Sequence, residues 1–466
     1  MLRIRFLGGL ASCLFFVACG GTGRLDSGGP DTIFGDGACP QCVDGEFPDG
    51  RPGGDGGDVQ GVDGADAVGG DAIGSDDGNP DGGGGGDAAD GGSGGDGAGP
   101  DALPMGPCAP VADSVKVARE VRVIARPVYV QPGGAGFVVG NRAQRLGLDN
   151  VFLTRMGTDG ASQGDGNVSE LVGPLVEGGS IAADGTGYVM AFSSNDAGNI
   201  EVYVRRVSSA GAPTGAAIRV TNDAFTSQDA QIVASPGGWI VVWRSRDDGS
   251  GAMQLLASAI SSGAFTASAP IPVTATGVTP GSFDVASDGT NVAVSYVSQR
   301  TATGELFAVP LMASGAPNGA PMQLTTGTII SDTTGAAIRG ADLAVVWAER
   351  GATSTLHLRH ANVTTRVMDV QRDVPTAGFD LSKPSIAVDG TGFVVAFRRG
   401  GSPLGTVQLM RFAADLTPRD GASRVDDATT GDIVRIAARG DGTYIVGWAD
   451  DFPTGTIASV RVIRCP

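Results

Sequence analysis

The side chains that can carry out acid–base, redox or covalent chemistry are few in this sequence. The chain has 466 residues with only two histidines, His357 and His360. Histidine is the side chain that ordinarily titrates near neutral pH, so few candidates exist for general acid–base catalysis. The two histidines lie three residues apart in an alternating segment, and such residues face opposite sides of a strand. We therefore expect surface or edge histidines, no metal site and no cofactor. With no recognisable nucleophile motif or phosphate-binding loop, no catalytic residue can be assigned.

The six cysteines lie in three parts of the chain: in an N-terminal export signal, in an acidic segment that follows it, and near the two ends of the remaining sequence. They are Cys13, Cys19, Cys39, Cys42, Cys108 and Cys465. Residues 1–19 have the pattern of an export signal, in which Arg3 and Arg5 precede an apolar run from Phe6 to Val17. This run has the length of a signal-peptide core and is too short for an ordinary membrane span. Export to an oxidising compartment would favour disulfides among the remaining cysteines.

The end of this signal, Phe16-Val17-Ala18-Cys19-Gly20, resembles the lipobox of bacterial lipoproteins. The resemblance implies that residues 1–18 are removed and that Cys19 carries the lipid anchor. It also implies that Gly20, standing where Asp would retain a lipoprotein at the inner membrane, favours the outer membrane. The alternative is a plain secretory signal with a coincidental cysteine.

Residues 19–104 are predicted to be a disordered, acidic tether. Positions 20–104 hold 17 Asp and one Glu against two Arg, a net charge of −16, and about a third of them are Gly. Such a segment buries too little apolar surface to fold, and as a coil it would span roughly 50 Å. A weak calcium site is the alternative to a simple spacer, although the Asp spacing does not fit a calcium loop. Cys39-Pro-Gln-Cys42 is interpreted as a possible second, local disulfide rather than a redox motif.

Beyond residue 105 one pattern recurs seven times, an Asp-Gly type turn followed by an apolar strand. These strands begin at Phe137, Tyr188, Trp239, Val292, Leu343, Phe393 and Tyr444, with spacings of 51, 51, 53, 51, 50 and 51 residues. Each copy has four short segments with strand signals, and alternation of this kind is typical of half-buried strands. Four strands in a period near 50 are typical of a propeller blade. We predict an all-β fold for 105–466, a seven-bladed β-propeller of four-stranded antiparallel blades.

The seventh copy lacks a fourth strand, and the N-terminal side of the domain can supply it. A segment at about 115–123 lies two periods before the fourth strand of the second copy, so we expect it to complete the last blade and remove two free sheet edges. Cys108 and Cys465 then fall at the same seam, and a disulfide is expected between them. The alternative is two unrelated thiols.

An aromatic residue closes the second strand in six copies: Phe192, Trp243, Tyr296, Trp347, Phe397 and Trp448. We interpret these as packing between blades, with a ring of ligand-stacking residues as the alternative. Small residues share one position of the first strand, in Ala182, Ala286, Ala337, Ala387 and Ala438, and are expected to crowd the axis. Asp184, Asp288 and Asp389 share a turn position, where an Asx turn explains them. They match the Asp-box turns of bacterial sialidases only in part.

The repeats resemble the D-G-T-x-[YF]-[LV]-V-[VA]-[WF] arrays of envelope lipoproteins from myxobacteria-like Gram-negative bacteria. This resemblance covers nearly all of 109–464 and implies architecture rather than activity. We expect a monomeric binding scaffold whose partner is an envelope protein or a glycan. The alternative is a glycan-acting enzyme of the sialidase or lyase kind. Residues 105–466 have a net charge of only −4 with no concentrated basic patch, which argues against nucleic acid as a partner.

Overall fold

The structure, a computed structural model, describes residues 106–119, 129–145, 148–170, 176–246, 252–275, 277–298, 304–327, 330–349, 354–369, 371–374, 381–400, 405–429, 433–452 and 455–466. The predictions for the signal peptide, for Cys19, for Cys39 and Cys42, and for the tether fall outside the described residues. Everything below concerns the unit that follows residue 91.

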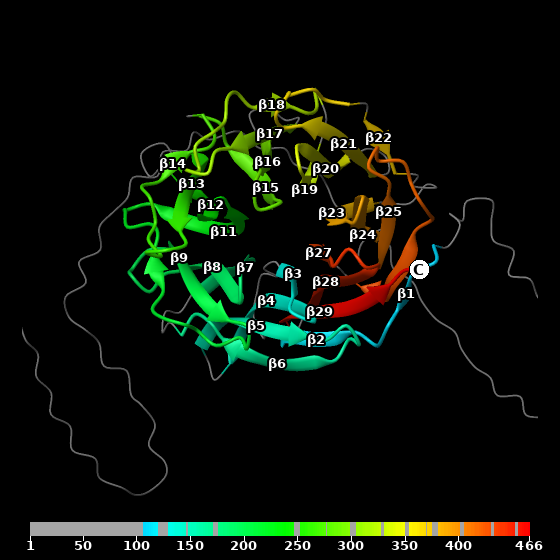
Figure 1. Ribbon diagram of the computed structural model, residues 1–466, viewed down its shortest axis with the longest axis horizontal. Helices are drawn as coiled ribbons and strands as arrows, with labels where there is room; N and C mark the ends of the chain where they lie inside the picture. Colours follow the sequence, from blue (N-terminus) through cyan, green and yellow to red (C-terminus); the bar gives the residue numbers. More distant parts are fainter. Residues whose placement is uncertain are drawn as a thin grey trace, which may run out of the picture. The chain divides into compact units, whose positions relative to one another are not determined.

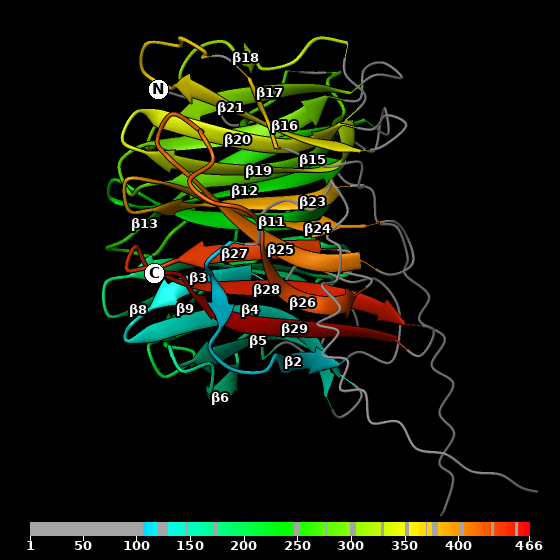
Figure 2. The ribbon, with the colours of Figure 1, turned by 90° about the vertical axis from the view of Figure 1, so that its right-hand side faces the viewer.

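The described strands form seven antiparallel sheets, one for each sequence repeat, arranged around a common axis (Figure 1). The sheets are seen edge on in Figure 2, with their strands running along the axis. We number them as blades 1 to 7 in chain order. The all-β, seven-bladed fold predicted from the repeats is confirmed.

The strand bounds follow the repeat. Blade 1 is β3 (Tyr129–Gly133), β4 (Gly136–Arg145), β5 (Leu148–Met156) and β6 (Ser162–Asn167). Blade 2 is β7 (Val176–Asp184), β8 (Gly187–Ser194), β9 (Glu201–Ser208) and β10 (Ile218–Arg219). Blade 3 is β11 (Thr226–Ser235), β12 (Gly238–Arg246), β13 (Met253–Ser261) and β14 (Ile271–Pro272). Blade 4 is β15 (Pro280–Ser287), β16 (Val292–Ser298), β17 (Glu305–Leu311) and β18 (Met322–Gln323).

The remaining blades repeat the same order. Blade 5 is β19 (Ile330–Arg339), β20 (Asp342–Glu349), β21 (Thr355–Asn362) and β22 (Arg372–Asp373). Blade 6 is β23 (Leu381–Asp389), β24 (Gly392–Arg399), β25 (Gly405–Phe412) and β26 (Ser423–Thr429). Blade 7 is β27 (Ile433–Ala438), β28 (Thr443–Phe452) and β29 (Gly455–Arg464), joined by β2 (Val115–Arg119) and β1 (Ala109–Pro110).

Blade 7 is completed by strands from the two ends of the repeat array. Val115 pairs with Val460 and Arg119 with Ile457, so β2 lies on β29 where the other blades have their fourth strand. β1 continues the same edge, with Ala109 opposite Arg464. A disulfide joins Cys108 to Cys465 across a sequence separation of 357 residues. The seam is therefore closed both by main-chain pairing and by a covalent bond.

Seven apolar clusters hold the ring together, one at each interface between neighbouring blades. The six repeat aromatics belong to six different clusters, and each is at most 2% exposed. In blade 1 the equivalent residue is Asn141, which is also buried and whose amide donates to Thr154 Oγ1 at 3.3 Å. Burial of this kind leaves no face of these rings free for a ligand, so they act in packing.

The register of blade 7 differs from the sequence alignment of the repeats. Ala182, Ala337 and Ala387 each pair with the second residue of the apolar strand that follows. In blade 7 that partner, Ile445, faces Ala437, whereas Ala438 pairs with Tyr444. The prediction that Ala438 is the equivalent residue is therefore wrong by one position. The β27–β28 turn contains one extra residue, accommodated by Gly440 and Gly442 at φ values of 80° and 79°.

Candidate binding site: the central channel

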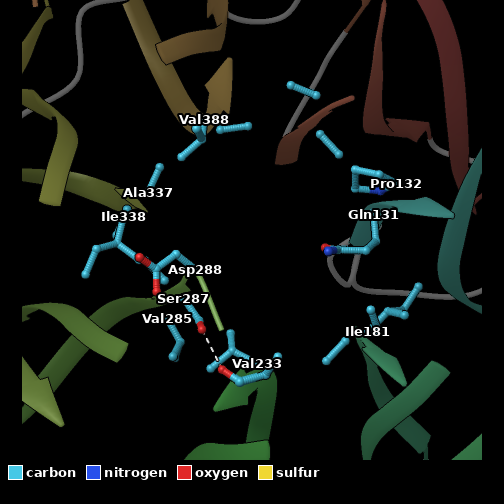
Figure 3. Close-up of a pocket in the computed structure, with 18 of the residues that line it drawn as sticks. Gln131, Pro132, Ile181, Val233, Val285, Ser287, Asp288, Ala337, Ile338 and Val388 are labelled. Atoms are coloured by element: carbon cyan, nitrogen blue, oxygen red, sulfur yellow. Dashed lines mark hydrogen bonds between the residues drawn. The ribbon is translucent and has the colours of Figure 1, made fainter. Parts of the chain in front are cut away.

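The first strand of every blade lines a cavity of about 460 Å³ at the ring axis. Its wall is mostly aliphatic and comes from three consecutive residues of each first strand, such as Ile181, Ala182 and Ala183 in blade 2. Figure 3 shows these side chains arranged around an open centre. The alanines singled out by the repeat pattern, including Ala438, all belong to this wall. The volume of the cavity falls within the range of ordinary ligand pockets.

Polar side chains are sparse in the wall: they are Gln131, Ser287 and Asp288, of which Ser287 and Asp288 are bonded to the protein. Ser287 Oγ donates to the carbonyl oxygen of Ala234 in the neighbouring blade, as drawn in Figure 3. Asp288 follows it, and its Oδ1 accepts the N–H groups of Thr290 at 2.9 Å and Asn291 at 2.7 Å. This is the Asx turn predicted at that position. Among the described residues that line the cavity, Asp288 is the one ionisable side chain.

The electrostatics of Asp288 suit a structural carboxylate rather than an acid catalyst. Burial alone would raise the pKa of Asp288, but the N–H groups of Asn291 and Thr290 outweigh burial and hold the pKa below its ordinary value. The N–H of Gly340, in the adjacent hairpin of blade 5, acts in the same direction. Asp288 therefore stays ionised at neutral pH and links two blades.

The other two turn aspartates have different partners. Asp184 forms an ion pair with Arg206 at 3.1 Å. Asp389 accepts a hydrogen bond from the hydroxyl of Tyr444 at 2.8 Å, so it joins blade 6 to blade 7. A shared sequence position thus gives an Asx turn in blade 4 and side-chain pairing in blades 2 and 6.

Tyr444 and Asp389 line a smaller pocket of about 310 Å³ at the seam of blades 6 and 7, together with Arg411 and Arg419. This set resembles the tyrosine–carboxylate pair and arginines that a sialidase-like mechanism requires. However, burial and the hydrogen bond to Asp389 raise the pKa of Tyr444 well above its ordinary value, so its hydroxyl remains protonated. Arg411 is already paired with Asp420, its Nε lying 2.8 Å from Oδ2. The geometry is that of a structural network.

The two histidines make separate contacts on blade 5. His357 Nδ1 lies 2.7 Å from Asp373, and His360 Nδ1 lies 2.8 Å from Asp369. His357 is only 8% exposed and packs 5.5 Å from the ring of Trp347, so the prediction of a surface position is wrong for this residue. Cross-strand pairing of His357 with Trp347 places it against the core.

No group of three or more His, Cys, Asp or Glu side chains suited to a metal ion occurs within the described ranges. In the same part of the chain, no helix has the length and apolar character needed to cross a membrane.

Sequence reasoning did not single out Asp284 and Arg435, which lie one residue beyond the aliphatic wall in β15 and β27. Comparing the copies could have found both residues, because a charge there replaces the Tyr, Ser, Gln or Gly of other blades.

No protein-family model and no curated protein matches the chain. Among solved structures it is similar to the Dos1 propeller, at 9% identity and a TM-score of 0.40, over 77% of this chain and 95% of that one. It is also similar to the β-propeller domain of the trilobed protease of Pyrococcus furiosus, at 8% identity and a TM-score of 0.42, over 73% and 94% of the two chains. A subtype N11 neuraminidase-like protein of A/flat-faced bat/Peru/033/2010 (H18N11) matches at 12% identity and a TM-score of 0.40, over 78% and 98%. The blade count itself rests on this chain's own strand pairing.

Proposed function

We propose that this protein is a lipid-anchored envelope protein that presents its propeller as a binding scaffold. The observation that carries the proposal is the wall of the central channel, which is aliphatic and contains one ionisable side chain, Asp288, among the described residues. Glycoside hydrolysis by the common mechanisms needs two carboxyl groups roughly 5–10 Å apart. Asp288, held ionised by its N–H donors, cannot serve as both acid and nucleophile. Asp284, four residues earlier and within β15, lies about 13 Å away along the strand direction, beyond the range for a carboxyl pair. The wall therefore favours binding over the glycan-acting alternative.

The partner is proposed to be an envelope protein or a glycan that enters the channel mouth. The test is capture of envelope components by the full-length protein, compared between two matched variants. Val388→Trp places a bulky ring in the channel wall, whereas Val367→Trp changes a residue of the same type that is 58% exposed and does not line the channel. Capture should be lost in the first variant and kept in the second. Equal capture by both would overturn the proposal.

The anchor is proposed from the sequence pattern that ends at Cys19. Several acyl chains would hold the protein firmly at a membrane, at about 0.8 kcal/mol for each buried CH₂. The acidic segment 19–104 would then serve as a spacer between the membrane and the propeller. Mass spectrometry of the mature amino terminus should find a lipid-modified Cys19. Cleavage at another residue, or an unmodified Cys19, would contradict the anchor without touching the binding proposal.

A further inference from the structure

Blade 1 differs from the other blades at one position of the channel wall. The wall residue opposite the second residue of the following strand is alanine in blades 2, 4, 5, 6 and 7 and Val233 in blade 3. In blade 1 this residue is Gln131, opposite Val138. Since the other blades pack with a short aliphatic side chain at this position, the ring does not require the glutamine for its stability.

The Gln131 amide is available to a ligand. It lines the cavity, and Figure 3 shows it pointing into the open centre. No protein group within the described ranges forms a hydrogen bond with its side chain. A primary amide has one acceptor oxygen and two N–H donors, and all of them remain unused by the protein. Gln131 is therefore the polar side chain of the wall that is free to bind.

Asp288 carries a negative charge that no cation of the described residues neutralises. At the same turn position, Asp184 is paired with Arg206 at 3.1 Å. Asp389 likewise lies 3.7 Å from Arg419. The partners of Asp288 are uncharged N–H groups, and the described residues that line the cavity include no Lys, Arg or His. The channel therefore attracts cations and repels anions.

The two groups lie on opposite sides of the channel and at different depths. Gln131 comes from β3 of blade 1 and Asp288 follows β15 of blade 4, and Figure 3 places them across the open centre. By register Gln131 is level with Ala286, two residues before Asp288. This step corresponds to about 6–7 Å along the strand, and the wall between the two levels is mostly aliphatic. A group that enters at the hairpin end passes Asp288 first and reaches Gln131 after an apolar section.

We propose that the channel receives a lysine side chain of a partner protein, its ammonium group bound by the Gln131 amide oxygen and attracted by the Asp288 carboxylate. This rests on the proposed binding function and names the partner's chemistry. An extended lysine side chain measures roughly 6 Å from Cα to Nζ, which matches the depth of Gln131 below Asp288. Its methylene groups suit the aliphatic wall, whereas the hydroxyl groups of a glycan would find few partners there. A compact ammonium ion can use a single amide oxygen, whereas the planar guanidinium of arginine needs several acceptors in one plane.

The test titrates N-acetyl-lysine methylamide and N-acetyl-norleucine methylamide into the full-length protein by calorimetry. Norleucine has the same four-carbon chain and lacks the ammonium group. Capped lysine should bind on the order of tenfold more tightly, because only its charge is attracted by Asp288. Capped ornithine, one methylene shorter, should bind about fourfold more weakly than capped lysine, because one fewer CH₂ is buried. Raising the salt concentration should reduce the preference for lysine.

Two variants separate recognition from folding. Gln131→Ala gives blade 1 the residue of most other blades, so Tm should stay unchanged while the preference for capped lysine falls by about threefold. Asp288→Asn should reduce the preference to about twofold or less, because the attracting charge is gone. Asp184→Asn, at the same turn position but outside the channel, should leave the preference intact. Capped norleucine should bind these variants and the wild type equally, whereas a merely structural role would weaken both probes.

Equal binding of capped lysine and capped norleucine by the wild-type protein would overturn the inference. A preference that survives both Gln131→Ala and Asp288→Asn would also overturn it, because the ammonium group would then bind elsewhere. If Val388→Trp still loses envelope capture while the two probes bind equally, the binding proposal stands and this inference falls. If Val388→Trp leaves capture unchanged, the proposed function itself falls.

Discussion

The seam between the two ends of the repeat array offers a direct test of how the ring is stabilised. The perturbation is the double variant Cys108→Ser/Cys465→Ser, which removes the disulfide and leaves β1 and β2 free to pair with β29. A cross-link stabilises a protein largely by restricting its unfolded chain, and the effect grows with the length of the loop it closes. For a separation of 357 residues the chain-entropy relation gives roughly 5–6 kcal/mol.

The measured loss should be smaller, because unfolded chains retain residual structure and native disulfides typically contribute about 2–5 kcal/mol. With an unfolding entropy of about 2.1 cal/mol/K per residue over a domain of roughly 360 residues, this loss lowers Tm by about 3–7 °C. Differential scanning calorimetry measures the shift, and urea unfolding gives the free energy independently.

The matched control is Cys39→Ser/Cys42→Ser, which removes the other proposed pair and should leave Tm unchanged. Wild-type protein in reductant should behave like the Cys108→Ser/Cys465→Ser variant. If the Cys108→Ser/Cys465→Ser variant has the same Tm as the wild type, the reasoning that the seam disulfide restricts the unfolded chain is refuted. Non-reducing peptide mapping would then show whether Cys108 and Cys465 are joined at all.

The remaining predictions concern four single substitutions. Trp347→Ala should lower the free energy of unfolding by about 3–5 kcal/mol, because it empties a fully buried site between blades 4 and 5; a loss below about 1 kcal/mol in urea unfolding would contradict the packing role. Glu201→Gln should cost about 1–3 kcal/mol in the same assay, because buried Glu201 pairs with Arg219 at 2.6 Å; unchanged stability would show that the pair contributes nothing net. The pKa of Asp288 is lowered in the fold, so the stability that its ionised carboxylate contributes is present above its unfolded pKa of about 4. This stability is lost as pH falls through the folded pKa. Asp288→Asn should therefore lower Tm at neutral pH and match the wild type in strong acid. The pKa of Asp284 is raised in the fold, so ionisation of its carboxyl group opposes folding at neutral pH. Asp284→Asn should raise Tm at neutral pH and have no effect below about pH 4. A Tm shift of the same sign for Asp288→Asn and Asp284→Asn would contradict the opposite directions of the two pKa shifts.

The sequence by itself determined the fold class, the blade count and the strand order within each blade. Alternation of apolar residues, Gly-rich turns and a steady period are local properties, and they are readable before any contact is known. A seam strand starting near residue 115 and the approach of Cys108 to Cys465 were predicted from the position of that period, and the structure describes the strand over Val115–Arg119. The six repeat aromatics were interpreted as packing because a residue that returns once per blade has a fixed place in each sheet.

Only the tertiary structure decided which side chains meet. Asp184, Asp288 and Asp389 share one sequence position, yet their carboxylates bond to an arginine, to backbone N–H groups and to a tyrosine. One extra residue in the β27–β28 turn shifts the register of blade 7 by one position. The sequence spacing had instead aligned Ala438 with the repeat alanines of the other blades. Asp284 and Arg435 are 151 positions apart and influence each other only because closure of the ring brings blades 4 and 7 to opposite sides of one narrow channel. The period specifies the position of every residue within its blade, but contacts across the axis depend on the ring's closure and on side-chain conformation, which local patterns do not encode.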